Sequence, residues 1–405
     1  MTENSTSEPS RAGLPLWTRL LFWSILVLIV VVALEGVGQV YLRVFRGYAG
    51  GEFLQYEFDP YKNIHPSRNW VDTRGVLRHN AQGFRRDEPV TRRKPDGTYR
   101  VFLMGASTAY GTGSMFTHIE TEFDVLDNSE TIDAYLEDLL SESLDHDRVE
   151  VINAGIPSVW THHHLIYLNQ TILDYEPDLI IFIDGWNDHY ETDRNHDQFA
   201  TYAQTEQAQR IMGPATLSSL IRMNGWWLFR KSAFAHVAIR AMRNAKTILS
   251  GNSTPPPIDV ERSLEDLEYV FERNALEMIE RNALLLQHEG IPAVFVLQPV
   301  LILEREHYDR MPPPEQELFD FMVGWQEGAE EFYSRATPMI ADRIEEVVES
   351  LGGHFVDLTD IYDAAEGTQV YTDYVHLTPY GNRIVAERLA ETIRDLVSSD
   401  LAETP

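Results

Sequence analysis

The chain has 405 residues, of which 43% are hydrophobic, and a formal net charge of −30 at pH 7. This length and apolar content are enough for one large α/β core with additional segments. The strong negative charge argues against a nucleic-acid partner, because nucleic-acid-binding proteins need a positive surface for the phosphates. The chain has no cysteine, which excludes disulfides, a thiol nucleophile and a cysteine-ligated zinc ion.

The N-terminal residues divide into a polar tail and an apolar helix. We expect residues 1–16 to be disordered, and an almost unbroken apolar run follows at 20–34. Trp17 and Tyr41 bracket this run at a spacing of about 36 Å of helix, which predicts a single transmembrane anchor over 17–41. The competing interpretation is a cleaved signal peptide, which the length of the run and the poor cleavage site disfavour.

Residues 42–98 are predicted to form a linker and an extended segment. Several glycines and prolines are typical of irregular structure. We expect the stretch GVLRHNAQGFRR at 75–86 to pack on the domain that follows, which we place at 99–398.

Within 99–398, strand patterns alternate with helix patterns, and this alternation predicts right-handed crossovers and a parallel sheet. The predicted strands lie at 99–104, 149–153, 179–183, 292–297 and 354–358. The predicted helices lie at 131–144, 161–173, 264–288, 324–350 and 379–397, and Pro338 is expected to interrupt the fourth.

Small or polar residues follow the first three strands. Ser107, Gly155 and Asn187 come after the first, second and third strand, respectively. The carboxyl ends of parallel strands meet at one edge, where open α/β sheets bind ligands. A serine next to a base becomes a nucleophile, and a glycine amide and an asparagine side chain are typical oxyanion-hole donors. Each residue alone is equally typical of a turn, so the prediction depends on their combination.

A candidate base lies near the C-terminus. Asp373 and His376 stand three residues apart, just before a helix that Pro379 can begin. At this spacing the carboxylate can orient the imidazole and stabilise its charged form, and His376 can then deprotonate Ser107. A lone histidine in a loop is more often a surface residue, so this role also depends on the other blocks.

The four blocks VFLMGAST (101–108), VINAGIPS (151–158), LIIFIDGWND (179–188) and YTDYVHLTPYGN (371–382) resemble those of SGNH (GDSL-like) hydrolases in order and local setting. The resemblance covers about 99–396. It implies a three-layer α/β/α fold with a central parallel sheet of the flavodoxin-like kind, and ester hydrolysis or acyl transfer through an acyl-serine.

Carried over by position, the resemblance implies a Ser107–His376–Asp373 triad. It assigns the oxyanion hole to the Ser107 amide, the Gly155 amide and the Asn187 side chain. One departure concerns Ala106, which stands where the family usually has aspartate, and this puts the positioning of the serine loop in question.

An insertion at about 189–260 interrupts this domain. Residues 207–258 contain no Asp or Glu, and they carry cations at Arg210, Arg222, Arg230, Lys231, Arg240, Arg243 and Lys246. Three interpretations stay open: a helical lid on the core, a segment that contacts the membrane surface, and a binding surface for an anionic glycan.

We predict no metal and no cofactor. His162, His163 and His164 are adjacent, and neighbouring side chains on a helix point in different directions, so they are poorly placed for one metal site.

The prediction is a single-pass membrane protein with a serine esterase or O-acyltransferase domain on the extracytoplasmic side. That side rests on the resemblance to membrane-anchored members, because the flanking charges do not decide it. The first choice of substrate is an acyl group, especially acetyl, on a cell-envelope carbohydrate, and the second is a lipid ester. The alternative is an inactive scaffold of an envelope assembly, with Ala106 as an early sign of drift.

Overall fold

The computed structural model describes residues 15–45, 55–115, 123–143, 148–190 and 255–403, apart from single positions 60, 73 and 366. It also describes residue 192 and the short stretches 232–235, 237–238 and 241. The tail before residue 15, part of the linker and most of the insertion, including most of 207–258, lie outside these residues.

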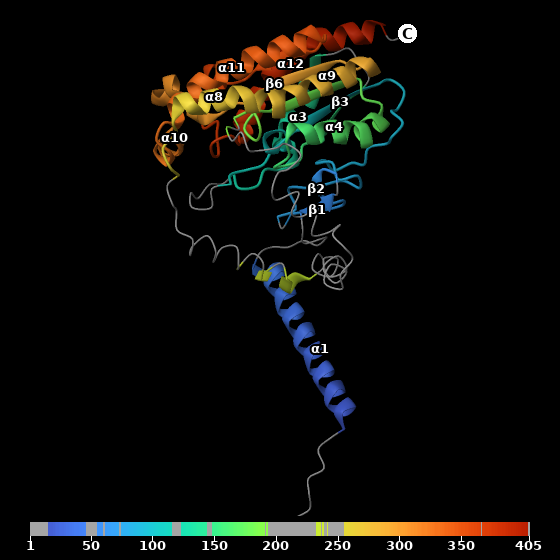
Figure 1. The fold of residues 1–405 in the computed structure, drawn as a ribbon. Helices are drawn as coiled ribbons and strands as arrows, with labels where there is room; N and C mark the ends of the chain where they lie inside the picture. Colours follow the sequence, from blue (N-terminus) through green and yellow to red (C-terminus); the bar gives the residue numbers. More distant parts are fainter. Residues whose placement is uncertain are drawn as a thin grey trace, which may run out of the picture.

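Five parallel strands form the central sheet of the main body (Figure 1). They are β3 (Thr98–Gly105), β4 (Arg148–Asn153), β5 (Leu179–Asp184), β6 (Ala293–Leu297) and β7 (His354–Asp357). The strand order is β4-β3-β5-β6-β7, so the first strand of the sheet lies between the second and the third. This is the flavodoxin-like order, in which ligands bind where the strand order reverses, here between β3 and β5.

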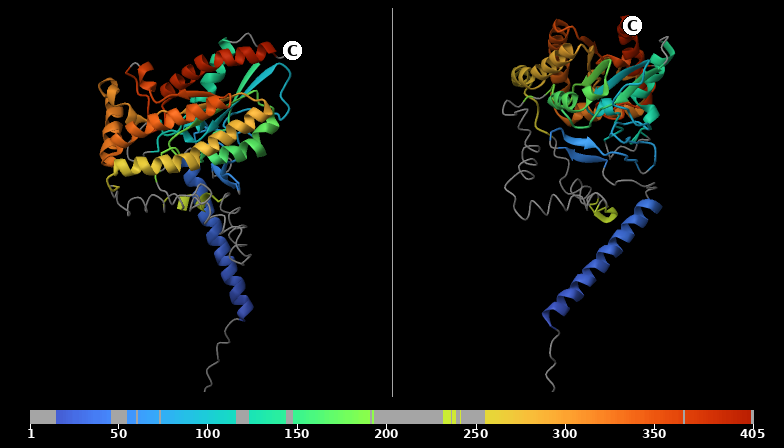
Figure 2. Two further views of the ribbon diagram at one scale, coloured as in Figure 1. Left: turned by 45° about the horizontal axis from the view of Figure 1, so that its top comes forward. Right: turned by 90° about the vertical axis from the view of Figure 1, so that its right-hand side faces the viewer.

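Helices cover both faces of the sheet, which confirms the predicted three-layer α/β/α fold (Figures 1 and 2). One face packs against α3 (Ile132–Ser143), α10 (Pro313–Trp325) and α12 (Pro379–Glu403). The other face packs against α4 (Thr161–Gln170), α8 (Val260–Phe271), α9 (Glu277–Glu289) and α11 (Ala329–Ser350). Because both faces are covered, β3 and β5 are buried along their whole length, and most of their side chains are apolar.

Two helix predictions need correction. The helix expected at 264–288 begins at Val260 and contains a π-helical turn, Glu272–Leu276, between α8 and α9. The helix expected at 324–350 is two helices, α10 and α11, separated at Gly328, whose φ is 86°. Pro338 lies inside α11 without ending it, because the buried residues of the same helix hold it against the sheet.

The N-terminal region consists of a long apolar helix and a hairpin (Figure 2). Helix α1 (Leu16–Val40) continues into a π-helical turn, Tyr41–Phe45, and its apolar side chains are exposed. It is the one helix among the described residues that is long and apolar enough to span a membrane. The linker contains an unpredicted antiparallel hairpin, β1 (Tyr56–Asp59) and β2 (Asn63–Pro66).

Candidate active site

The candidate nucleophile lies directly after β3. Ser107 is the first residue of the short helix α2 (Ser107–Tyr110), and its side chain is half-buried. Gly105 makes the tight turn between strand and helix, with φ of 142°. A Cβ atom at Gly105 would lie 2.2 Å from the carbonyl oxygen of Ile183, so only glycine lets β3 end this close to β5.

Asp373 and His376 form a buried pair in the loop before α12. The Nδ1 atom of His376 lies 2.9 and 2.8 Å from the two carboxylate oxygens of Asp373. Asp373 also accepts hydrogen bonds from the backbone amides of Met115, Val375 and His376. Burial alone would raise the pKa of Asp373, but the interaction with the imidazole of His376 and the hydrogen bonds from backbone amides lower it below its usual value.

The other imidazole nitrogen, Nε2 of His376, is buried and has no hydrogen-bond partner among the described residues. Because Nδ1 faces a carboxylate, the proton of the neutral ring is assigned to Nδ1, which leaves Nε2 as an acceptor. A buried acceptor without a partner is costly unless a ligand or a reacting group uses it. The pair is therefore arranged as a base oriented by a carboxylate.

Hydrogen bonds connect the loop that holds His376 to α2. Thr108 Oγ1 donates a hydrogen bond of 3.4 Å to the carbonyl oxygen of Val375, and Gln298 Nε2 donates to Thr108 Oγ1 at 3.2 Å. Thr108 follows Ser107, and Val375 precedes His376. No hydrogen bond joins Ser107 Oγ to His376 Nε2 within the described residues, and such bonds often form only once substrate is bound.

Asn187 lies in the loop after β5 and holds the turn after β4. Its half-buried side chain donates from Nδ2 to the carbonyl oxygen of Val159 at 2.7 Å. The next residue, Asp188, accepts hydrogen bonds from the amide and the hydroxyl of Thr161. The amide group of Asn187 has two N–H bonds, so one remains for a ligand while the other fixes its orientation.

Gly155 has a different environment from the one expected. Its N–H donates to Oδ1 of Asn153 at 3.0 Å, so this amide already has an acceptor in the present conformation. A Cβ atom at Gly155 would lie 2.4 Å from the backbone nitrogen of Tyr110, which shows that glycine is needed for the close approach of α2. The nearby Ser158 has a left-handed φ of 62°, and its amide makes no hydrogen bond among those of the described residues. Sequence alone did not indicate Ser158, because serine is not a residue type that signals this conformation.

The three adjacent histidines point to different partners. His164 pairs with Asp184 at 2.9 Å, and His163 accepts a hydrogen bond from the amide of Trp160. His162 makes ring contacts instead, because its centroid lies 3.9 Å from that of His163 and 6.1 Å from that of Trp160. Among all the residues that the structure describes, no three His, Asp or Glu side chains are grouped so that they could hold a metal ion.

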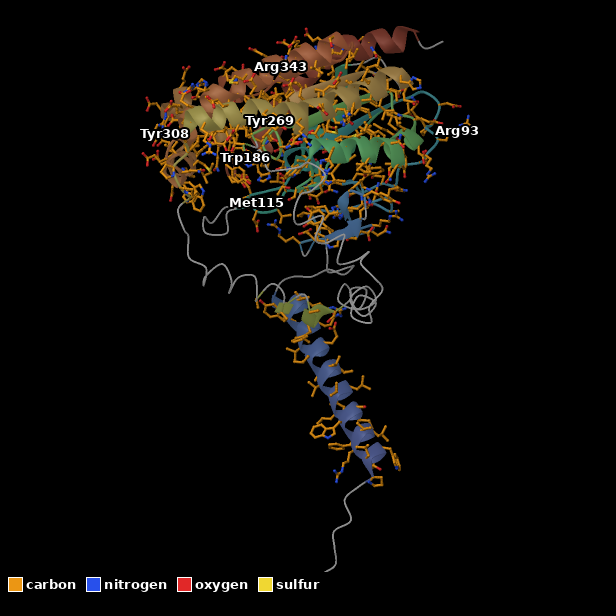
Figure 3. All side chains as sticks on the ribbon, viewed as in Figure 1. Arg93, Met115, Trp186, Tyr269, Tyr308 and Arg343 are labelled. Atoms are coloured by element: carbon orange, nitrogen blue, oxygen red, sulfur yellow. The ribbon has the colours of Figure 1, made fainter. Side chains whose placement is uncertain are left out.

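An aromatic cluster, formed by Trp186, Tyr190, Tyr333 and Tyr374, lies beside the site. The ring centroid of Trp186 lies 5.0 Å from that of Tyr333 and 4.8 Å from that of Tyr374. Trp186 directly precedes Asn187, and Tyr374 lies between Asp373 and His376. Trp186, Tyr333 and Tyr374 are each partly exposed, so the cluster gives this edge of the site an apolar, aromatic border. Figure 3 labels Trp186 on the main body.

Comparisons with known proteins give distant likenesses only. No protein-family model matches the chain, and no curated protein matches it. Among solved structures, the chain is similar to Axe2, an acetylxylan esterase from Geobacillus stearothermophilus, at 13% identity and a TM-score of 0.36, covering 73% of this chain and 94% of that one. It is also similar to LAE5, an alpha/beta hydrolase enzyme from the metagenome of Lake Arreo, Spain, at 12% identity and a TM-score of 0.34, covering 72% and 94%. These values are too low to carry an activity from one protein to another.

Proposed function

We propose that the chain is a serine esterase or O-acyltransferase that uses Ser107, His376 and Asp373. The observation that supports it most directly is the state of His376, whose Nδ1 is bound by Asp373 while its buried Nε2 has no partner among the described residues. Its loop contacts α2, which begins with Ser107. Nucleophilic catalysis by serine needs this combination of hydroxyl, base and orienting carboxylate.

In the proposed reaction, His376 Nε2 takes the proton of Ser107 Oγ as that oxygen attacks the ester carbonyl carbon. The carbonyl oxygen becomes negatively charged, and His376 then gives its proton to the departing alcohol oxygen. Water or an acceptor hydroxyl attacks the acyl-serine in the second half-reaction, again with His376 as base. Hydrolysis and transfer differ only in this second nucleophile.

The Ser107 amide and the free N–H of Asn187 are the proposed oxyanion donors. Gly155 can contribute only if its amide is released by Asn153, whereas the amide of the exposed Ser158 has no acceptor among the described residues. We therefore propose Ser158 as an alternative third donor. Removing a single donor of this kind typically lowers kcat by about 100- to 1000-fold.

A small acyl group on a carbohydrate is the proposed substrate class. Sugar rings present apolar C–H faces that pack on aromatic side chains, and the cluster around Trp186 supplies such side chains beside Asn187 and His376. A lipid ester is the second candidate. It would also use an apolar border but would extend along it with a longer acyl chain.

A panel of 4-nitrophenyl esters tests these proposals. We expect hydrolysis of the acetate to exceed that of the octanoate, with both abolished in Ser107→Ala. Ser350→Ala, at the far end of α11, is the matched control. Adding acetylated and unacetylated oligosaccharides then measures how the acyl group divides between water and a sugar hydroxyl. A folded wild-type protein without Ser107-dependent turnover would favour the inactive scaffold instead.

We also propose that α1 is a membrane anchor that stays on the mature protein. Glu35, near its C-terminal end, accepts hydrogen bonds from the hydroxyl of Ser232 and the amides of Ala233 and Phe234. A Cβ atom at Gly38 would lie 2.7 Å from the amide nitrogen of Phe234, so α1 approaches this part of the insertion closely. A helix removed as a signal peptide would leave this contact without its partner, which favours an anchor.

Cysteine labelling tests anchor and orientation together, because the natural chain has no cysteine. Glu349→Cys places a thiol at an exposed site on α11, and Thr2→Cys places one in the N-terminal tail. We expect a membrane-impermeant maleimide to label Glu349→Cys, but not Thr2→Cys, in intact cells. The opposite pattern would contradict an extracytoplasmic catalytic domain, and a purified protein lacking residues 1–38 would contradict the anchor.

A further inference from the structure

Arg85 is a buried cation whose hydrogen-bond acceptors are all uncharged. Its side chain is 1% exposed, and it comes from the segment before the main domain. Its Nη1 donates to the carbonyl oxygens of Tyr110 at 2.8 Å and Gly111 at 2.5 Å. Its Nη2 and Nε donate to the carbonyl oxygens of Leu126 and Asp127 and to Oδ1 of Asn128. All five N–H groups of the guanidinium are thus used on neutral oxygens.

Burying the Arg85 guanidinium in this way lowers the stability of the fold. A buried charge without a counter-ion costs more than a buried ion pair, even when it is fully hydrogen-bonded. The other fully buried arginine, Arg100, shows the usual solution, because its Nε and Nη2 bind Glu150 at 3.0 and 2.9 Å. Within the described residues no carboxylate forms an ion pair of this kind with Arg85. Its charge does act on the buried Asp133, where burial raises the pKa of the carboxyl and Arg85 opposes that rise.

The carbonyl groups that Arg85 holds belong to the end of α2. Tyr110 is the last residue of this helix, and Gly111 follows it with a left-handed φ of 80°. The amides of Gly111 and Thr112 in turn bind the carbonyl oxygen of Ser107. Arg85 therefore contacts the single turn of helix that begins with Ser107, at a distance of about 5 Å along the helix axis.

Other side chains hold the same turn. Asn153 Nδ2 donates to the carbonyl oxygen of Ala109 at 3.0 Å. The hydroxyl of Tyr110 is bound by His79 at 2.6 Å and by Gln55 at 2.9 Å. Three of the residues that fix α2, namely Gln55, His79 and Arg85, thus come from the segment that precedes the sheet.

We propose that Arg85 is a positioning residue for the nucleophile: its guanidinium fixes the end of α2 and so the place of Ser107. This inference rests on the proposed function. A nucleophile must be held in its attacking geometry, and a displacement of about 1 Å can lower the rate by about 100-fold. The segment at 55–90 is then part of the catalytic apparatus and not only a linker.

The test compares Arg85→Gln and Arg85→Lys with the double variant Arg100→Gln/Glu150→Gln in the full-length protein. The double variant removes the other buried guanidinium at the far end of β3, together with its partner. For Arg85→Gln we expect kcat for 4-nitrophenyl acetate to fall by about 10- to 100-fold, with KM changed by less than about 3-fold. Arg85→Lys should recover part of this loss, because its ammonium can still donate to some of these carbonyl oxygens but lacks the planar fork. The Arg100 double variant should lower the melting temperature but leave the kcat of the folded protein within about 3-fold of wild type.

A second readout separates this inference from the proposed function. Amide hydrogen exchange of residues 107–112 should be faster in Arg85→Gln and unchanged in the Arg100 double variant, whether or not the protein is an esterase. If wild type shows no esterase activity but this exchange difference appears, the proposed function fails while the positioning of α2 stands. A folded Arg85→Gln variant with wild-type kcat, or with wild-type exchange at 107–112, would overturn the inference.

Discussion

The carboxylate of Asp373 accepts hydrogen bonds from both the imidazole Nδ1 and the backbone amide of His376, at 2.8 and 3.0 Å. It therefore fixes the position of His376 in the loop as well as the orientation and tautomer of its ring. The three-residue spacing in the sequence makes both contacts possible within one turn of loop. In the proposed mechanism, the same carboxylate thus holds the loop and orients the base.

Asp373→Asn should preserve the conformation of the loop but prevent His376 from acting as an effective base. The amide oxygen of asparagine can still accept from the His376 backbone, but its NH2 group would favour the ring tautomer with the proton on Nε2. We expect kcat to fall by about 1000-fold or more, as when an orienting carboxylate is replaced by an amide. Circular dichroism should give a melting temperature close to that of wild type. A variant with kcat within 10-fold of wild type would exclude Asp373 from the triad.

Gly155→Ala should displace the nucleophile helix. The added methyl group would meet the backbone of Tyr110 at 2.4–2.7 Å, and backbone atoms cannot move aside as a flexible side chain can. We expect a loss of about 1–3 kcal/mol in the free energy of unfolding, together with most of the esterase activity. Gly324→Ala, in α10, is the matched control because nothing lies within 4 Å of its added atom. Equal stability and activity of the two variants would show that α2 does not need this close approach.

Ala106→Asp, which restores the residue usual in SGNH hydrolases, should be unfavourable in this chain. Ala106 is 4% exposed and belongs to the apolar cluster that also contains Ile156 and Val159. A carboxylate placed there loses its hydration, and we expect a loss of about 2–4 kcal/mol in the free energy of unfolding. Ala106→Ser serves as the smaller polar control and should cost less. Chemical denaturation measures both values. An aspartate variant as stable as wild type would mean that the site accommodates the carboxylate.

Glu315 should make the stability of the fold depend on pH. This buried side chain in the first turn of α10 accepts hydrogen bonds from the amides of Val370 and Tyr371, just before the loop that holds Asp373 and His376. Burial raises the pKa of Glu315 to about 7, and it raises that of the neighbouring Glu304 to about 8. Since both values lie above those of an unfolded chain, the stabilisation is complete below about pH 4.5 and is lost as the pH rises toward 7–8.

Glu315→Gln should remove part of this dependence, because its amide stays neutral at every pH in the range. For wild type we expect the melting temperature to fall between pH 5 and pH 8.5, and for Glu315→Gln we expect a smaller fall. The exposed Glu317→Gln, on the same helix, is the control and should follow wild type. Comparing wild type with Glu315→Gln isolates the contribution of Glu315, because the other titrating groups are the same in both proteins. A wild-type melting temperature that falls no more steeply with pH than that of Glu315→Gln would contradict the assignment.

The sequence predicted the parts of the fold that depend on local pattern. Each run predicted as a strand, from 99–104 to 354–358, is a strand of the sheet. The run at 179–183 is the clearest case, because a strand buried on both faces is mostly apolar. Ser107 and Asn187 follow the carboxyl ends of β3 and β5, which are neighbours in the sheet. The pairing of Asp373 with His376 was also readable, since three residues of loop bring them together.

Features that depend on distant residues were not predictable in this way. The amide of Gly155 is occupied by the side chain of Asn153, and no sequence pattern reveals which rotamer an asparagine adopts. Arg85 binds carbonyl groups 25 to 42 residues further along the chain, so its role appears only once the segments have packed together. Pro338 was expected to break a helix that tertiary packing holds intact.

The measurement that tests the central claim most directly is labelling of the purified full-length protein with a fluorophosphonate probe, which reacts only with an activated serine. Wild type should be labelled at Ser107, and neither Ser107→Ala nor His376→Ala should be labelled, although both should remain folded. Labelling that survives in either variant would place the nucleophile or the base elsewhere. A folded wild-type protein that is not labelled at all would contradict the esterase account.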